Sequence, residues 1–238
     1  MFRILISQID NVNPKIGLLP VNYIPIEWTS LLKGGRPIYD GGMAHNHIMS
    51  KLDDQIKTIF PSMIDIGHIN CTSNEGRHHI AELCEIYHNL SGYGSQVGFC
   101  KLWPTSSKTL AADKIVASIS RPFQQDRYGQ PNVLKLIQFI TCWAHPFTTV
   151  WDEWEELLEA SITEASKYHK PVYADMSVLF HPTSKALAGK LIEPSRLKTM
   201  LKRIYSAGFD GVMIRDYGPE LKVAYYEAIL SSLNQINE

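Results

Sequence analysis

Short apolar runs alternate with longer amphipathic segments along most of the chain. The runs are rich in β-branched and aromatic residues and end at polar residues or glycine, which is typical of buried strands. They cover residues 2–7, 37–40, 63–69, 96–103, 134–143, 171–180 and 211–215. We predict a strand in each of these segments.

The segments between the runs carry apolar residues at helical spacing. Residues 151–168 place apolar side chains on one face and acids in the first turns, where they suit the helix dipole. Residues 194–206 begin with Pro194, and Gly208 follows as a stop signal. Further helices are predicted at residues 26–33, 47–59, 74–90, 109–119 and 219–233, and irregular segments at 10–23 and 120–132.

The repeated order of strand then helix predicts a parallel sheet with helical crossovers. Seven or eight such units in 238 residues fit a (β/α) TIM-type barrel, here a single domain over residues 1–238. An open doubly wound sheet is the alternative. Residues 8–11, after the first strand, lack the glycine-rich nucleotide fingerprint, and we expect no cofactor.

Composition and charge narrow the class of partner. The chain is 45% hydrophobic with a formal net charge of −1, which allows a sizeable core and disfavours nucleic acid as the main partner. No apolar run is long enough to span a bilayer, and the first residues are too quickly polar for a secretory signal. The four cysteines are scattered, so we expect free thiols in a cytoplasmic protein without a membrane partner.

Polar and aromatic residues collect where the predicted strands end. In a parallel barrel these ends form the functional face. Carboxylates there can protonate a leaving oxygen or stabilise an oxocarbenium-like centre, and aromatic rings can stack on the C–H faces of sugars. Histidines His68, His145 and His181 are candidates for proton transfer or hydroxyl contacts. We therefore expect a carbohydrate substrate or ligand.

The candidate site residues fall into two groups. The catalytic candidates are Asp65, Asp175, Asp216 and His68, and the substrate-binding candidates are Tyr39, Asp40, Trp103, Trp143, His145, Tyr173, Arg215 and Tyr217. Three of these acids have a structural alternative. Asp65 can pair with a strand-end histidine or arginine, and Asp216 can form a simple ion pair with Arg215. Asp40, before two glycines, can act in a turn or as a helix cap.

Three stretches resemble the hyaluronidases among the barrel glycoside hydrolases. They are residues 94–104, 134–180 and 201–217, and the last is the clearest. There a helix leads through Gly208-Phe209-Asp210-Gly211 into an apolar strand, in the way that this family enters a strand from Gly-Ala-Asp-Gly. The resemblance implies a barrel that acts on a glycan.

One position departs from that family's pattern. The family carries Asp-x-Glu at the end of its catalytic strand, where the Glu donates the proton and the Asp positions the substrate. Asp65 matches the Asp, but Gly67 stands at the Glu position and cannot donate a proton.

Three hypotheses follow from these residues. In the first, Asp65 works with a second acid, Asp175 or Asp216, in a glycosidase. In the second, the barrel binds a glycan without hydrolysing it. The third is a metal-dependent hydrolase that uses His45, His47 and His145, although we expect no metal.

Overall fold

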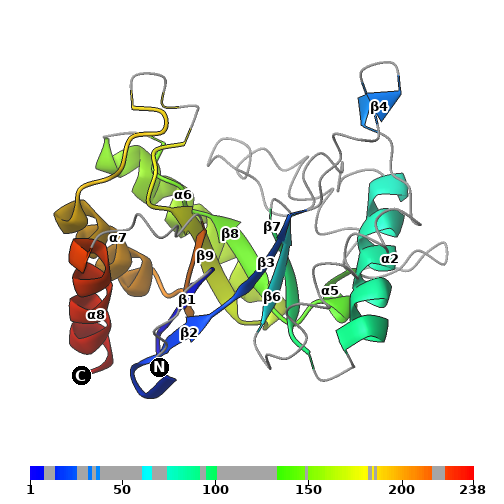
Figure 1. Cartoon of the computed structure of the whole chain (residues 1–238), viewed down its shortest axis with the longest axis horizontal. Helices are drawn as coiled ribbons and strands as arrows, with labels where there is room; N and C mark the ends of the chain where they lie inside the picture. The colour runs from blue at the N-terminus through cyan, green and yellow to red at the C-terminus, as the bar shows by residue number, and fades with distance from the viewer. Residues whose placement is uncertain are drawn as a thin grey trace.

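The computed structural model describes residues 1–7, 14–25, 32–33, 36–37, 61–65, 74–91, 95–100, 133–147, 150–181, 184, 187–215 and 223–238. These residues form an α/β structure in which parallel strands lie between helices (Figure 1).

A five-stranded parallel sheet contains both the first and the last of the described strands. Its order is β2-β1-β10-β9-β8, with β1 at Arg3–Ile6, β2 at Leu18–Pro20, β8 at Ile140–Trp143, β9 at Val172–Ser177 and β10 at Gly211–Arg215. The first and last strands pair directly, with Arg3 opposite Gly211. Sequence-distant segments therefore build one sheet, as expected for parallel strands with crossover connections.

A second parallel sheet has the order β3-β6-β7, with β3 at Asn22–Pro25, β6 at Ser62–Asp65 and β7 at Val97–Cys100. This sheet contacts the first sheet on two sides. Only Val21 separates β2 from β3, and its backbone N–H donates to Ile6 at 3.1 Å. On the other side, the Gln138 N–H donates to the Val97 carbonyl at 2.9 Å, and Thr141 Oγ1 donates to the Phe99 carbonyl. Strand β7 therefore lies beside β8.

The helices lie outside the strands (Figure 1). They are α2 (Asn74–Ser91), α5 (Val133–Leu136), α6 (Trp151–Ala165), α7 (Pro194–Ser206) and α8 (Val223–Asn237), with short 3-10 turns at Pro14–Ile16 and Ser166–Tyr168. A two-residue antiparallel pair joins β4 (Leu32–Lys33) to β5 (Arg36–Pro37). The side chain of Asn237 fixes α8 to β1, because it exchanges two hydrogen bonds with the backbone of Phe2.

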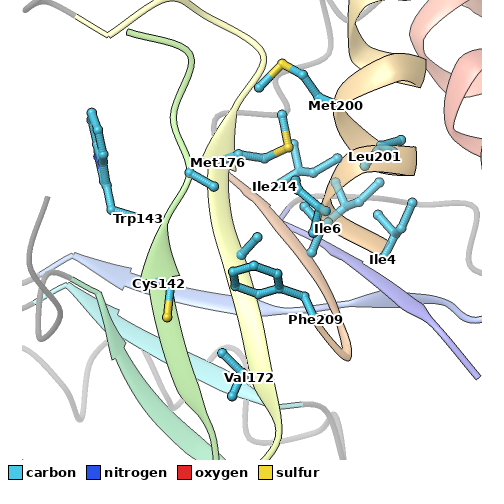
Figure 2. Close-up of a cluster of buried hydrophobic side chains, with 14 of the residues drawn as sticks. Ile4, Ile6, Cys142, Trp143, Val172, Met176, Met200, Leu201, Phe209 and Ile214 are labelled. Atoms are coloured by element: carbon cyan, nitrogen blue, oxygen red, sulfur yellow. The ribbon is translucent and has the colours of Figure 1, made fainter. Parts of the chain in front are cut away.

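Alternate residues of each strand enter two separate cores. Ile4 and Ile6 of β1 lie with Ile214 of β10 against Met200 and Leu201 of α7 (Figure 2). The intervening residues turn to a smaller apolar cluster drawn from the strands and the segments next to them. Its members are Leu5, Val21, Met63, Phe139, Tyr173 and Met213, all 5% exposed or less. Strands with one face on helices and the other on further strands are buried on both sides, which explains their continuous apolar runs.

Several predicted elements are confirmed. Helix α7 and strand β10 have the predicted ends, and α2 and α6 differ by a few residues. The stop at Gly208 is real, since its φ of +98° lies in the left-handed region that favours glycine. Asp210 forms a structural contact at the amino end of β9, where its carboxylate accepts the Val172 N–H at 2.8 Å.

Three local predictions are wrong. Residues 18–20 form one strand and residues 22–25 begin another where the sequence predicts an irregular segment over 10–23. Both β2 and β3 are edge strands of their sheets, where the missing N–H of Pro20 and Pro25 is tolerated. Residues 133–136 form a helical turn before β8, whereas the sequence predicts one strand over 134–143. Residues 32–33 form β4, not the end of a helix. The predicted helices at 47–59 and 109–119 and the irregular segment 120–132 lie outside the described residues.

Two thiols can be placed. Cys84 and Cys142 are buried and free, as predicted. Burial raises the pKa of both thiols, and the negative charge of Asp175 adds to the effect at Cys142. Among the helices that the structure describes, none has the length and apolar character to cross a membrane.

The contact between β7 and β8 can be tested at Gly98. A Cβ on Gly98 would lie 2.1 Å from a ring carbon of Phe139, the residue before β8. We expect Gly98→Ala to lower the free energy of unfolding by about 1–3 kcal/mol through overpacking. The measurement is urea unfolding of the wild type and the variant. Phe139→Leu is expected to restore part of the loss in the double variant, whereas additive losses would contradict the contact.

Candidate functional site

The strand alternation that builds the smaller core also positions a group of charged residues. Asp65, Asp175 and Arg215 each lie two residues beyond a member of that core, Met63, Tyr173 and Met213 respectively. Successive side chains of a strand point to opposite faces, so residues two apart share a face. The charged residues therefore continue the inner face of the strands toward their carboxyl ends.

The guanidinium of Arg215 connects both carboxylates. Its Nε lies 2.7 Å from Asp175 Oδ1, and its Nη1 donates to Asp65 Oδ2 at 3.3 Å. The three residues come from β10, β9 and β6, which belong to two different sheets. All three are nearly inaccessible, with exposed fractions of 7% for Arg215, 1% for Asp175 and 8% for Asp65. The bridge is therefore a buried ionic network.

Tyr23 of β3 completes the surroundings of Asp65. Its hydroxyl donates to Asp65 Oδ2 at 2.7 Å and accepts from Arg215 Nη1 at 3.4 Å. The Arg215 guanidinium carbon also lies 5.6 Å from the centre of the Tyr23 ring, within cation–π distance. One oxygen of Asp65 thus receives two donors, a phenol and a guanidinium.

His145, two residues beyond β8, joins the network through its Nε2. That atom contacts Arg215 Nη2 and lies 3.7 Å from Asp175 Oδ1. Arginine can only donate, so Nε2 of His145 must accept the hydrogen bond. We assign the ring as the neutral tautomer with its proton on Nδ1.

A group of rings lies next to His145. Trp143 stacks on His145 (5.6 Å between ring centres, 23° between planes) and on Phe147 (5.3 Å, 26°). His181 meets Trp143 edge-on at 5.2 Å and lies 5.7 Å from His145. Trp143 is buried and belongs to the larger hydrophobic core (Figure 2), whereas Phe147 and His181 are partly exposed. The charged network therefore has an aromatic border on the β8 side.

This arrangement determines which chemistry the two carboxylates can perform. A guanidinium in direct contact favours the ionised form of each carboxyl group. Ionised carboxylates accept hydrogen bonds and stabilise nearby positive charge. A proton donor has to be protonated, so Asp65 and Asp175 are poorly suited to general acid catalysis in this state.

The structure brings together only some of the predicted site residues. Asp65, Asp175, His145 and Arg215 meet in the network, with Trp143 adjacent. Tyr173 lies elsewhere. It packs edge-on against Phe139 (5.5 Å, 87°), and its phenol is hydrogen-bonded to Arg3, near the amino end of β1. Burial is the main reason why the pKa of Tyr173 is raised. The remaining candidates lie outside the described residues: Tyr39, Asp40, His45, His47, Gly67, His68, Trp103, Asp216 and Tyr217.

Tyr23 is not among the predicted site residues, because it lies in residues 10–23, which the sequence predicts to be irregular. The available signal was the alternation of Leu19, Val21 and Tyr23, which lie at the smaller core. Within the residues that the structure describes, no group of three His, Cys, Asp or Glu side chains could hold a metal ion.

The fold is similar to that of known glycoside hydrolases. No protein-family model matches this sequence, and no curated protein matches it. Two crystal structures of bee venom hyaluronidase, one of them in complex with a hyaluronic acid tetramer, align over 100% of this chain. They share 12% identity with it, cover 98% and 97% of their own chains, and give TM-scores of 0.59 and 0.58. A structure assigned as an α-L-fucosidase from Bacteroides thetaiotaomicron aligns over 82% of this chain and 62% of its own, with 11% identity and a TM-score of 0.54. At this identity the likeness concerns the fold.

The network predicts a strong dependence of stability on Arg215. Arg215→Met leaves two buried carboxylates without their cation, and we expect a loss of about 3–5 kcal/mol in the free energy of unfolding at pH 7. The loss should shrink at pH 5, because the variant's carboxylates, buried without a cation, then bind protons and lose their buried charge, while the wild-type pairs stay ionised. Urea unfolding at both pH values measures this.

Arg203→Met is the matched control. Arg203 pairs with Glu155 on the helical surface, where both side chains are about one-third exposed. An exposed pair of this kind contributes about 0–1 kcal/mol, so only a small loss is expected. Similar losses for the two variants would contradict a buried network at Arg215.

Proposed function

We propose that the parallel strands close into one (β/α) barrel and that the chain binds a glycan at their carboxyl ends. The order of neighbours supports closure. From β3 the pairings run through β6 to β7, from β7 to β8 by side-by-side contact, and from β8 through β9, β10 and β1 to β2. Strand β2 continues into β3 after one residue. The strand-only core, lined by side chains from both sheets, supports the same closure.

One observation supports this function most directly. The network of Asp65, Arg215 and Asp175 lies beside the aromatic rings of Trp143, Phe147 and His181. Active and binding sites of (β/α) barrels lie at the carboxyl ends of the strands. Saccharides present hydroxyl groups that donate to carboxylates and C–H faces that pack on aromatic rings. Both kinds of partner occur together here. The likeness in fold to glycoside hydrolases supports a glycan as ligand, by analogy at the level of the fold.

Binding without hydrolysis fits this site better than glycosidase chemistry. Glycosidases of the usual kind need one carboxylic acid to protonate the leaving oxygen. Arg215 favours the ionised state of Asp65 and Asp175, and Gly67 occupies the position of the proton donor in the family that the sequence resembles. In this proposal both carboxylates accept hydrogen bonds from sugar hydroxyls.

Hydrolysis is the second candidate. The ionised state that prevents Asp65 and Asp175 from donating a proton is the state that stabilises an oxocarbenium-like centre. The proton would then come from another group, for which the sequence offers His68 and Asp216.

Binding is tested with a glycan array followed by titration calorimetry on the best ligand. We expect Trp143→Ala to weaken binding by about tenfold or more, since a stacked ring is worth on the order of 1 kcal/mol beyond the area that it buries. Trp143→Phe, which keeps an aromatic face, should retain most of the affinity, and circular dichroism checks that each variant folds.

Trp151→Ala is the matched control. Trp151 lies at the start of α6 between the guanidinium groups of Arg196 and Arg203, 4.2 and 4.4 Å from its ring centre. Its removal should leave glycan affinity unchanged. An array without any bound glycan, or equal effects of the two tryptophan variants, would contradict the proposed site.

Turnover separates the two candidates. We expect no release of reducing sugar from any glycan that binds, because the described network contains no proton donor of the required kind. The measurement is reducing-end release over a broad glycan panel. Release by the wild type that is lost in Asp65→Asn, but kept in Glu159→Gln on the exposed side of α6, would establish hydrolysis in place of binding alone.

A further inference from the structure

We propose that the site selects uncharged glycans and disfavours saccharides that carry carboxylate or sulfate groups. This inference rests on the proposed function and specifies the ligand class of the same site. It starts from the charges at the strand ends and from the atoms to which the arginine is already bound.

The Arg215 guanidinium is already in contact with groups of the protein. A guanidinium recognises a ligand carboxylate through two parallel N–H donors. In Arg215 the Nε lies 2.7 Å from Asp175 Oδ1 in an ion pair, Nη1 donates to Asp65 and Tyr23, and Nη2 contacts Nε2 of His145. Each of the three nitrogens therefore has a protein partner. A sugar carboxylate would have to displace one of the protein's own carboxylates to gain a two-donor contact.

His145 adds no positive charge to this network. Its Nε2 accepts from Arg215, which requires the neutral ring. The histidine therefore does not serve as a second anion-binding group.

The described strand ends carry an excess of negative charge. Across the last three residues of each parallel strand that the structure describes, Arg215 is the only Lys or Arg, whereas Asp65 ends β6 and Asp175 is the third residue from the end of β9. Two carboxylates against one guanidinium leave one negative charge. Like charges repel, so this excess disfavours an anionic sugar while it leaves hydroxyl donors unaffected.

The test compares glycans that differ only in charge. Suitable pairs are a hyaluronan tetrasaccharide with its carboxyl-reduced form, a glucuronate-bearing xylo-oligosaccharide with the plain oligosaccharide, and a sulfated with an unsulfated galacto-oligosaccharide. Calorimetric Kd values of the wild-type chain are measured at 20 mM and 300 mM salt. We expect the charged member of a binding pair to bind about tenfold or more weakly, with the gap narrowing at high salt.

Each outcome has a defined meaning. A gap of tenfold or more in favour of the neutral member supports the inference. A gap below threefold, or tighter binding of the charged member, overturns the inference and leaves the glycan-binding function standing. No binding by any member of any pair overturns the proposed function, and this inference with it.

A charge variant identifies the source of the discrimination. Asp65→Asn keeps the shape of the side chain and removes one negative charge from the site. We expect it to reduce the gap between charged and neutral members at least threefold, whereas Glu159→Gln, which removes the same charge from the exposed surface of α6, leaves the gap unchanged. Equal gaps in the wild type and Asp65→Asn would overturn the assignment to this network. If Asp65→Asn does not fold, the salt dependence of the wild type decides.

Discussion

The contact between the Arg215 guanidinium and the carboxylates of Asp65 and Asp175 is the interaction on which the site depends. The carboxylates come from separate sheets, so a single cation holds β6, β9 and β10 in register at their carboxyl ends. An ion buried without a partner is strongly destabilising, which makes each member of the network necessary to the others. The same mutual dependence restricts the chemistry of the site, because a carboxylate that neutralises an arginine is held in its charged form.

The two-residue period of the strands is what places this network inside. Residues of one parity pack on the helices, as Ile4, Ile6 and Ile214 do against α7. Residues of the other parity build the smaller core, and the charged residues follow two positions later on the same face. Apolar residues occupy the inner face and charged ones follow it toward the strand ends. The apolar layer below therefore supports the charged layer that meets the ligand in our proposal.

In our proposal this chain shares the fold of glycoside hydrolases without their activity. Its backbone is similar to that of bee venom hyaluronidase over its whole length, whereas the sequence resemblance puts Gly67 at the position of that family's proton donor. A barrel scaffold depends on its core and can persist when the groups at its strand ends change. The described strand ends carry a buried network of two carboxylates and one guanidinium, bordered by rings. In our proposal this network accepts hydrogen bonds from sugar hydroxyls and does not cleave the bond between sugars.

Local signals in the sequence were sufficient for helix 194–206, strand 211–215 and the stop at Gly208, since periodicity, a leading proline and a glycine with positive φ act within a few residues. The strand ends also identified Asp65, Asp175, His145 and Arg215 as candidates, because the topology of parallel strands collects their ends. Tertiary structure decided the rest. It made strands of residues 18–25 in spite of their prolines, and it brought Tyr23 to Asp65. It also turned Tyr173 toward Arg3 and Arg215 toward a carboxylate 150 positions away. Such pairings depend on strand register and side-chain reach, which no local pattern specifies.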